Sequence, residues 1–240
     1  MKLIKPYFEV MTPINGEEIL KQIELATRTC YKSEDKIEYE DLIDTGVASF
    51  SVIRDYTAIS ARPLIKMLIA KGHEAMLEFG SNLTVKFVCD RGVSHELVRH
   101  RIASFAQEST CYCNYGKDEH ITFIIPCWFT DEYSELMSYL NGYFDNGMPH
   151  KGVVIWLDHM NKCEREYNEL ITLGWQPQEA RSVLPNSLKT EINVSANIRE
   201  WRHIFKLRTA KTAHPQMREL MIPLLSEFKS KIPILFDDID

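Results

Sequence analysis

The chain has 240 residues, of which 45% are hydrophobic, and a formal net charge of −6 at pH 7. This length suits one large domain or two small ones with a real core, and the acidic balance lacks the basic footprint of a general nucleic-acid-binding protein. No run of about 18 apolar residues is present, so we expect no membrane span and neither nucleic-acid nor membrane partners.

Cysteine and histidine spacing indicates a reduced chain without a metal site. The six cysteines include no C-x-x-C pair, and the N-terminal segment MKLIKPYFEV is too short and too soon charged for a signal peptide. We therefore expect a cytoplasmic chain with free thiols. The lone C-x-C of Cys111 and Cys113 lacks the paired spacing of a structural zinc site. His95 and His100 are five residues apart, so they do not share a helix face as zinc ligands do.

Hydrophobic periodicity predicts the elements of the first half of the chain. In order, we expect a strand over 2–11, a helix that follows Asn15-Gly16, a polar loop over 26–36, a helix over 58–70 stopped by Gly72, a half-buried strand over 83–89, a turn over 90–92 and a short helix over 93–100. The opening strand offers Ile4, Tyr7 and Val10 to the core. The apolar stripe of the first helix is Ile19, Leu20, Ile23 and Ala26.

The second half is predicted to be mainly helical. In order, we expect a short strand over 121–125, a helix over 130–141, a long helix over 153–171, a brief helix from Pro177 that ends before Pro185, a strand over 188–196, a helix over 198–209 and a final helix from Pro215. Gly174 should end the long helix. Pro223 should kink or shorten the final one, because proline removes a helical hydrogen bond.

These elements predict one α+β domain over residues 1–240. The strands over 83–89 and 188–196 alternate apolar and polar residues, as strands of an antiparallel sheet with one covered face do. We therefore expect a mainly antiparallel sheet flanked by helices. No G-x-G-x-x-G or P-loop is present, so a Rossmann or Walker nucleotide site lacks its usual mark.

The stretch RHRIASFAQESTCYCNY contains a local excess of positive charge in an acidic chain. Arg99, His100 and Arg101 place two fixed cations beside an imidazole, and arginine binds phosphate or carboxylate through two N–H groups at once. The run of Glu108, Ser109 and Thr110 adds a carboxylate and two hydroxyls. A nucleotide-like anion could bind here. The alternative is a solvated charged face or an ion-pair network.

Two further polar groups lie outside this stretch. Late in the chain stand Arg181, Asn197, Arg199, Arg202, His203 and Arg208. They could complete an anion site, or they could belong to a basic amphipathic helix that faces water. His73, Glu74 and Glu78 follow a predicted helix end, where binding groups are common. The alternative for His73 is a simple helix C-cap.

The spacing Arg-His-Arg, seven residues, then Ser109 resembles the signature of the flavin-dependent thymidylate synthases. The resemblance extends more thinly from about Arg28 to about Arg208. It implies the fold of that family and reductive methylation of dUMP to dTMP. It also implies FAD as redox carrier, methylenetetrahydrofolate as carbon donor, NADPH as reductant and a homotetramer with active sites between subunits. Arginine forks and hydroxyls agree with an anionic nucleotide substrate.

The resemblance also implies a role for each matching residue. FAD would meet His73, Glu78, Arg99, His100, Arg101, Glu108, Asn197, Ile198, Arg199 and His203. The substrate dUMP would meet Glu96, Arg99, Glu108, Ser109, Thr110, Cys111, Tyr112, Arg181 and Arg208. Arg208 would be the catalytic residue that polarises the uracil ring. No base is evident beside Ser109, and a serine nucleophile needs one, so we interpret Ser109 as a phosphate or sugar ligand.

Cys111 departs from the family pattern, which has arginine there. A neutral thiol would remove a charge-assisted contact worth about 1.5–3 kcal/mol, or roughly 10–150-fold in affinity. Either Thr110 and Arg181 carry the phosphate alone, or the chain is a catalytically impaired flavin- or nucleotide-binding relative. Glu96, where glutamine is usual, and Ala75 are milder departures. A metal-dependent hydrolase is a third reading that the spacing disfavours.

Overall fold

The computed structural model describes residues 1–40, 55–115, 120–129 and 151–240. The helix expected over 130–141 lies outside these residues. None of the helices within them is both long and apolar enough to cross a membrane. All six cysteines are free thiols.

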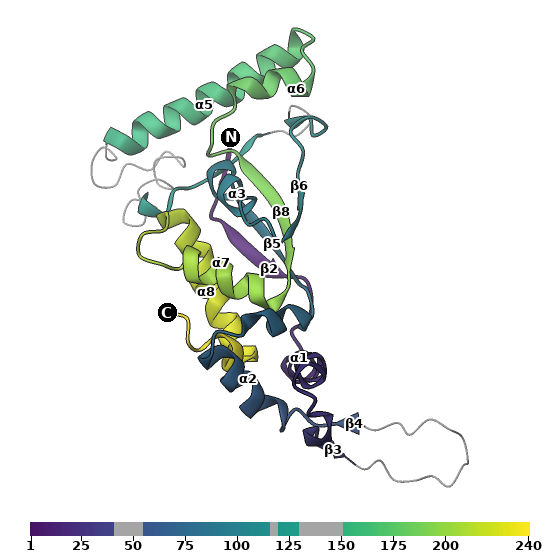
Figure 1. Cartoon of the computed structure of the whole chain (residues 1–240). Coiled ribbons are helices and arrows are strands. Elements are labelled where there is room, and N and C mark those ends of the chain that lie inside the picture. Colours follow the sequence, from purple (N-terminus) through teal and green to yellow (C-terminus); the bar gives the residue numbers. More distant parts are fainter. Residues whose placement is uncertain (41–54, 116–119, 130–150) are drawn as a thin grey trace.

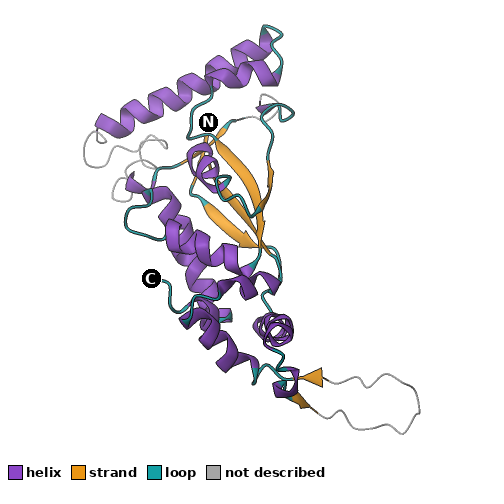
Figure 2. Cartoon of the chain, in the orientation of Figure 1, coloured by secondary structure: helices purple, strands orange, loops and turns teal. Residues whose placement is uncertain are grey.

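A four-stranded antiparallel sheet forms the centre of the molecule (Figures 1 and 2). Its order is β2 (Tyr7–Val10), β5 (Leu83–Asp90), β8 (Lys189–Ala196) and β6 (Ser104–Gln107). The register places Val85 opposite Val194 and Phe105 opposite the same valine on the other side. The predicted α+β class and antiparallel sheet are therefore confirmed. β6 is a strand that the sequence analysis missed, and it lies inside the RHRIASFAQES stretch.

Helices cover one face of this sheet and enclose the main core. They are α1 (Gly16–Tyr31), α2 (Ala61–Ala70), α3 (Arg91–Leu97), α7 (Ile198–Arg208), α8 (Pro215–Lys231) and α9 (Pro233–Phe236). Alternate residues of β5 and β8, such as Phe87 and Ile192, are fully buried against them. A cluster of aromatic rings, Trp201, Phe205, Phe228 and Phe236, joins α7 to α8 and α9. The core therefore fixes which face of α7 is turned outward.

A smaller apolar cluster lies beyond the carboxyl end of β5. There β1 (Lys2–Ile4) pairs in parallel with β7 (Thr122–Ile124), and α5 (Lys151–Thr172) and α6 (Pro177–Ala180) pack nearby (Figure 1). Tyr167 of α5 is buried in this cluster and its hydroxyl accepts a hydrogen bond from the Tyr115 backbone N–H, 3.3 Å away. The remaining strands, β3 (Tyr39–Glu40) and β4 (Asp55–Tyr56), pair with each other.

Some predicted boundaries are wrong for identifiable reasons. The opening strand is split into β1 and β2 around Pro6, which lacks a backbone N–H, and Tyr7 is exposed while Phe8 and Val10 pack on the core. The first helix continues through Tyr31, because Arg28 is buried in an ion pair with Glu24 one turn earlier. The polar loop therefore starts later than predicted.

A helix cap accounts for another boundary error, and the helix with the internal proline is longer than one of the two predicted outcomes. Helix α3 starts at Arg91, where a turn was expected, because the Asp90 carboxylate accepts the Val93 N–H at 2.7 Å and caps the helix. Helix α8 runs on to Lys231 past Pro223, so that proline does not shorten it. Buried Leu220, Leu224 and Phe228 hold the helix on the core on both sides of the proline.

Candidate active site

Arg208, at the end of α7, is held by groups from the Arg-His-Arg stretch and from α3. Its Nη1 lies 2.6 Å from Glu96 Oε2, and its Nη2 donates to the Glu96 carbonyl at 3.0 Å. Its Nε donates to His100 Nε2 at 3.0 Å. The structure therefore brings Arg208 together with Glu96 and His100, each of which lies more than a hundred residues earlier in the sequence.

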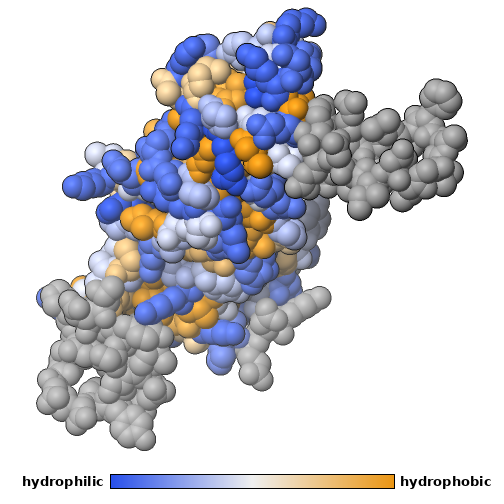
Figure 3. Space-filling model, turned by 90° about the horizontal axis from the view of Figure 1, so that it is seen from below, coloured by the Kyte–Doolittle hydropathy of each residue, from blue (hydrophilic) through white to orange (hydrophobic). Residues whose placement is uncertain are grey.

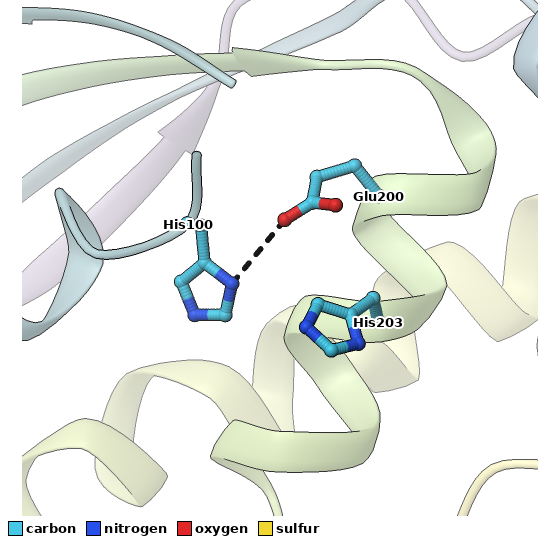
Figure 4. Close-up of side chains that lie close together, drawn as sticks. All are labelled: His100, Glu200 and His203. Atoms are coloured by element: carbon cyan, nitrogen blue, oxygen red, sulfur yellow. Dashed lines mark ion pairs between the residues drawn. The ribbon is translucent and has the colours of Figure 1, made fainter. Parts of the chain in front are cut away.

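His100 is a buried imidazole that faces α7 (Figure 4). Its Nδ1 lies 3.3 Å from Glu200 Oε1, and its ring meets that of His203 edge to face at a centroid distance of 5.7 Å. Burial, followed by the nearby Arg208 and His203, lowers the pKa of His100 to about 4. Burial also raises the pKa of Glu200, opposed by His203 and Arg199. At neutral pH His100 is therefore an uncharged ring.

His100, Glu200 and His203 have the donor types of a metal site. One ligand atom from each lies within 4.8 Å of the others. However, His100 Nε2 accepts a hydrogen bond from Arg208, so a neutral ring must carry its proton on Nδ1, the atom nearest Glu200. A metal ligand at that nitrogen would have to displace the proton. The arrangement fits a hydrogen-bonded network better than a metal centre.

Three segments expected to meet FAD converge around the start of α7. Asn197 caps this helix by accepting the Glu200 N–H at 2.9 Å. Arg199, two residues on, forms an ion pair with Glu78 of the 3₁₀ turn Glu74–Phe79. Buried Ile198 packs near Gly80, where no larger residue would fit because a Cβ would meet Ile198 at 2.6 Å.

The same region presents positive charge to solvent. Arg99 and Arg101 are exposed and have no ion-pair partner among the described residues, and His203 is also exposed. Unpaired guanidinium groups beside a helix start suit the phosphates of a dinucleotide. The residues present therefore fit FAD. His73 is exposed and shares a 2.8 Å hydrogen bond with the Tyr31 hydroxyl.

Glu108 and Thr110 belong to a second group, at the other end of β8. Glu108 Oε2 accepts from Lys189 at 3.1 Å, and its Oε1 accepts from the Tyr115 hydroxyl at 2.8 Å. Burial and these contacts with Glu108 raise the pKa of Tyr115. Thr110 Oγ1 accepts from Arg181 Nη1 at 2.8 Å. The predicted grouping of Arg181 with the Glu-Ser-Thr run is thus present, whereas the Glu108 carboxylate is occupied by protein donors.

A pocket of about 240 Å³ opens beside Thr110. Its lining includes Arg91, His95, Thr110 and Arg181, with Ser182, Leu184, Pro185, Asn186 and Leu188. Two arginine residues therefore line one small cavity, which makes it a candidate site for an anion. Arg91 Nη1 also donates to the Glu108 carbonyl at 3.4 Å and to Thr190 Oγ1 at 3.3 Å. The sequence analysis missed Arg91 and His95 as pocket residues. The signal was present, since Arg91 lies in the predicted turn after a strand, and binding groups often lie on such connections. A larger pocket of about 420 Å³, at the start of α1, contains none of the predicted site residues.

Ser109, Cys111 and Tyr112 form the turn after β6. Ser109 Oγ accepts from the Cys111 N–H at 3.3 Å, and no general base contacts that hydroxyl among the described residues. Cys111 is half-buried and does not line the pocket beside Thr110. Tyr112 is 90% exposed. The described part of the chain therefore leaves this aromatic ring almost entirely uncovered.

Arg202, by contrast, belongs to the fold. It is fully buried and pairs with Asp238 at 2.7 Å and Glu74 at 3.1 Å, and it also donates to the Leu235 carbonyl. It joins α7 to the C-terminal segment and to the 3₁₀ turn Glu74–Phe79. Among the arginine and lysine side chains of α7, Arg202 is therefore buried and structural, whereas Arg199 and Lys206 are exposed and Arg208 is half-buried.

Comparison with known proteins agrees with the motif. A family model described as "Thymidylate synthase complementing protein" matches residues 15–234. The chain is 30% identical over 227 residues to a flavin-dependent thymidylate synthase of Corynebacterium efficiens, covering 95% of this chain and 81% of that protein. It is 32% identical over 165 residues to the enzyme of that name from Pyrococcus horikoshii, covering 68% and 61%.

Solved structures with the same fold include the UMP/dUMP methylase PolB of Streptomyces cacaoi. With 5-Br dUMP bound, PolB aligns with a TM-score of 0.68 at 19% identity, covering 99% of this chain and 96% of that one. With 5-Br UMP bound, it aligns with a TM-score of 0.69 at 17% identity. The predicted fold is therefore confirmed over nearly the whole chain.

Proposed function

The chain belongs to the flavin-dependent thymidylate synthase family and is a methyltransferase of that family, and from this premise we propose that it methylates dUMP to dTMP. Methylenetetrahydrofolate would be the carbon donor, NADPH the reductant and FAD the bound flavin. The observation that carries the proposal is the fixed guanidinium of Arg208, held by Glu96 and His100 next to the exposed cations Arg99 and Arg101.

The phosphate of dUMP fits the pocket beside Thr110. Arg91 and Arg181 line this pocket, and a guanidinium group can form paired hydrogen bonds with phosphate oxygens. Arg181 is already aligned by Thr110. Ser109 adjoins Thr110 in the chain, and we assign it to binding the phosphate or sugar, because no base contacts its hydroxyl within the described chain and a nucleophilic serine needs one.

The uracil ring needs a cation beside it. Its double bond is too weakly electrophilic to react unaided, and negative charge develops on the ring oxygen and nitrogen during the reaction. Arg208 suits this role because its guanidinium keeps its charge at working pH. Its contacts with Glu96 and His100 use three of five N–H donors, so within the described chain two remain for the ring. When bound, FAD supplies the redox chemistry, and the protein supplies orientation.

Two features support a site shared between subunits of a homotetramer. The pocket beside Thr110 holds about 240 Å³, below the ~300–1,000 Å³ of most small-molecule sites, and Arg208 is not in its lining. Lys189 and Ala196 end β8, so Arg199 and the Glu108 region lie about a strand length apart, roughly 23 Å at ~3.3 Å per residue. A second copy could bring the two groups together.

Arg91 can replace the arginine that the family pattern has at position 111. It lines the phosphate pocket together with Arg181, so the site keeps two cations although Cys111 contributes none. This favours an active enzyme over the alternative of an impaired flavin- or nucleotide-binding relative. In that alternative, flavin would bind and dUMP would not turn over.

The visible spectrum of the purified protein, titrated with dUMP, tests the proposal. We expect a yellow protein, or one that becomes yellow with added FAD, whose flavin absorption changes as dUMP binds. UMP serves as the comparator, because PolB is described as a methylase of both nucleotides. A protein that takes up no FAD, or one whose flavin spectrum dUMP leaves unchanged, would contradict it.

A further inference from the structure

The network behind Arg208 contains one residue to which neither the motif nor the proposed reaction gives a role. Glu200 lies on α7, only 6% exposed, and points toward His100, which is 4% exposed (Figure 4). Burying a carboxylate costs free energy unless a nearby group pairs with it or hydrogen-bonds to it. Its nearest partner is the Nδ1 atom of His100, at 3.3 Å.

The proton on His100 can be located from its two neighbours. Arg208 Nε is always a donor, so His100 Nε2, 3.0 Å away, must accept and carries no proton. Burial and the positive charge of Arg208 lower the pKa of the ring to about 4, so it holds a single proton at neutral pH. That proton must lie on Nδ1. In water, by contrast, neutral imidazole exchanges freely between its two tautomers.

We propose that Glu200 is a positioning residue that holds His100 in the Nδ1–H tautomer, and that the free Nε2 lone pair thereby fixes the guanidinium of Arg208. The order of contacts is Glu200, His100, Arg208 and then Glu96. In the other tautomer, Nε2–H would point at Nε–H of Arg208, and the two donors would repel. Glu200 therefore sets the direction of a catalytic group that it does not touch.

The same geometry explains why the carboxylate is retained on α7. Glu200 stands in the first turn of the helix, where the helix dipole stabilises negative charge. Besides His100, the charged or titratable groups near it are His203 and Arg199 on the same helix. The helix thus holds a carboxylate oxygen 3.3 Å from His100 Nδ1, where it can accept the Nδ1 proton.

The first test locates the proton directly. Histidine is labelled with nitrogen-15, the His100 signals are identified by their loss in His100→Gln, and the protonated ring nitrogen is read from the spectrum at neutral pH. We expect Nδ1–H in the wild-type protein. Nε2–H, or a doubly protonated ring, would overturn the proposal. This measurement needs no turnover, so it stands even if the proposed dUMP methylation fails.

Two variants of similar volume then distinguish a hydrogen-bond-accepting role of Glu200 from a purely structural one. Glu200→Gln keeps an oxygen that can accept from Nδ1–H, whereas Glu200→Met fills the same space without an acceptor. We expect Gln to keep the tautomer and most of kcat. In Met the buried Nδ1–H loses its acceptor, so the ring should turn away from Arg208, the tautomers should mix and kcat should fall about 10–100-fold, as for other residues that orient a functional ligand. KM for dUMP should change less than ~3-fold, because the phosphate pocket is separate.

Two outcomes of the variant test would contradict the proposal. Unchanged tautomer and kcat in Glu200→Met would show that His100 needs no such partner. Equal losses in the Gln and Met variants would show that charge or packing matters and not the hydrogen bond. The tautomer rests on the contacts alone, and only the kinetic part rests on the proposed function.

Discussion

At the scale of single residues, we expect Arg91 to supply the phosphate contact that Cys111 cannot make. If Arg91 supplies the phosphate contact that Cys111 lacks, Arg91→Gln should weaken dUMP binding roughly 10–150-fold, the value of one charge-assisted contact. Adding Cys111→Arg to that variant should recover most of the loss. Isothermal titration of dUMP into the flavin-loaded protein measures both.

The control for this pair is Cys30→Arg. Cys30 is an exposed cysteine on α1, so its replacement adds the same charge far from the pocket and should leave dUMP affinity unchanged. If Arg91→Gln binds dUMP as tightly as the wild-type protein, Arg91 is not a phosphate ligand. The impaired-relative reading would then gain weight.

His100 predicts a specific pH dependence of stability. Its pKa in the fold is about 4, against 6.5 in the unfolded chain, because it is buried and faces Arg208 and His203. Between these values the unfolded state binds more protons, so the free energy of unfolding rises with pH. The contribution is complete above pH ~6.5 and is lost as the pH falls toward ~4. Urea unfolding at several pH values should show a shallower acid loss for His100→Asn.

The neighbouring Glu200 contributes with the opposite sign. Burial raises its pKa, so it favours the folded state at the acidic end and less so as the pH rises. Glu200 is present in both proteins, and the difference between the wild-type protein and His100→Asn therefore reports mainly on the imidazole. Parallel stability curves from pH 7 to pH 4.5 would contradict this account of His100.

The sequence indicated individual site residues where they stand at the spacing of a known motif. The Arg-His-Arg stretch pointed to His100, and the late cluster pointed to Arg208. The sequence could not show that Glu108 is occupied by Lys189 and Tyr115, because those partners come from other elements. It could not separate Arg202 from Arg199 either, since only the packing of α7 decides which cation faces inward.

At the scale of elements, Arg202 joins α7 to the C-terminal segment. Arg202→Met should destabilise the protein by about 3 kcal/mol, the low end for breaking a buried ion pair, because Asp238 can still reach water. Urea unfolding measures the loss. Arg62→Met is the control, since its partner Glu17 is exposed and such surface pairs contribute at most about 1 kcal/mol. Equal effects of the two substitutions would contradict a structural role for Arg202.

Strong hydrophobic periodicity predicted the helices and strands that have it. Elements set by tertiary contacts could not be predicted from it. The alternation in β5 and β8 and the stripe of α1 were sufficient for their assignment. β6 was missed because its four residues, Ser104–Gln107, carry little alternation and form a strand only by pairing with β8. The cap at Asp90 moved the start of α3, and the core carried α8 past Pro223, which are both tertiary effects.

At the scale of the whole molecule, exposed apolar residues indicate further contacts. Tyr112 is 90% and Ile102 66% exposed, and both flank the short edge strand β6. Apolar residues also form separate patches on the face seen in Figure 3. These features agree with burial against other copies of the chain, which no single sequence pattern reveals.

Mixed oligomers can test whether two subunits share one site. Arg208→Lys and Arg181→Gln are each expected to abolish most activity. If each site takes Arg208 from one subunit and Arg181 from another, co-expressed variants that mix at random should regain roughly a quarter of wild-type activity. The mass of the oligomer, by sedimentation, should be four times 27.9 kDa. No regain of activity in a mixed oligomer would place both arginines in the same chain.

The most direct test of the central claim is tritium release from dUMP labelled at carbon 5. With FAD, NADPH and methylenetetrahydrofolate present, we expect release that stops when any one of them is omitted. Arg208→Lys should lower the rate at least ~100-fold, the usual cost of removing a preorganised stabiliser of developing charge. A flavin-loaded wild-type protein that releases no tritium under these conditions would contradict the proposed reaction.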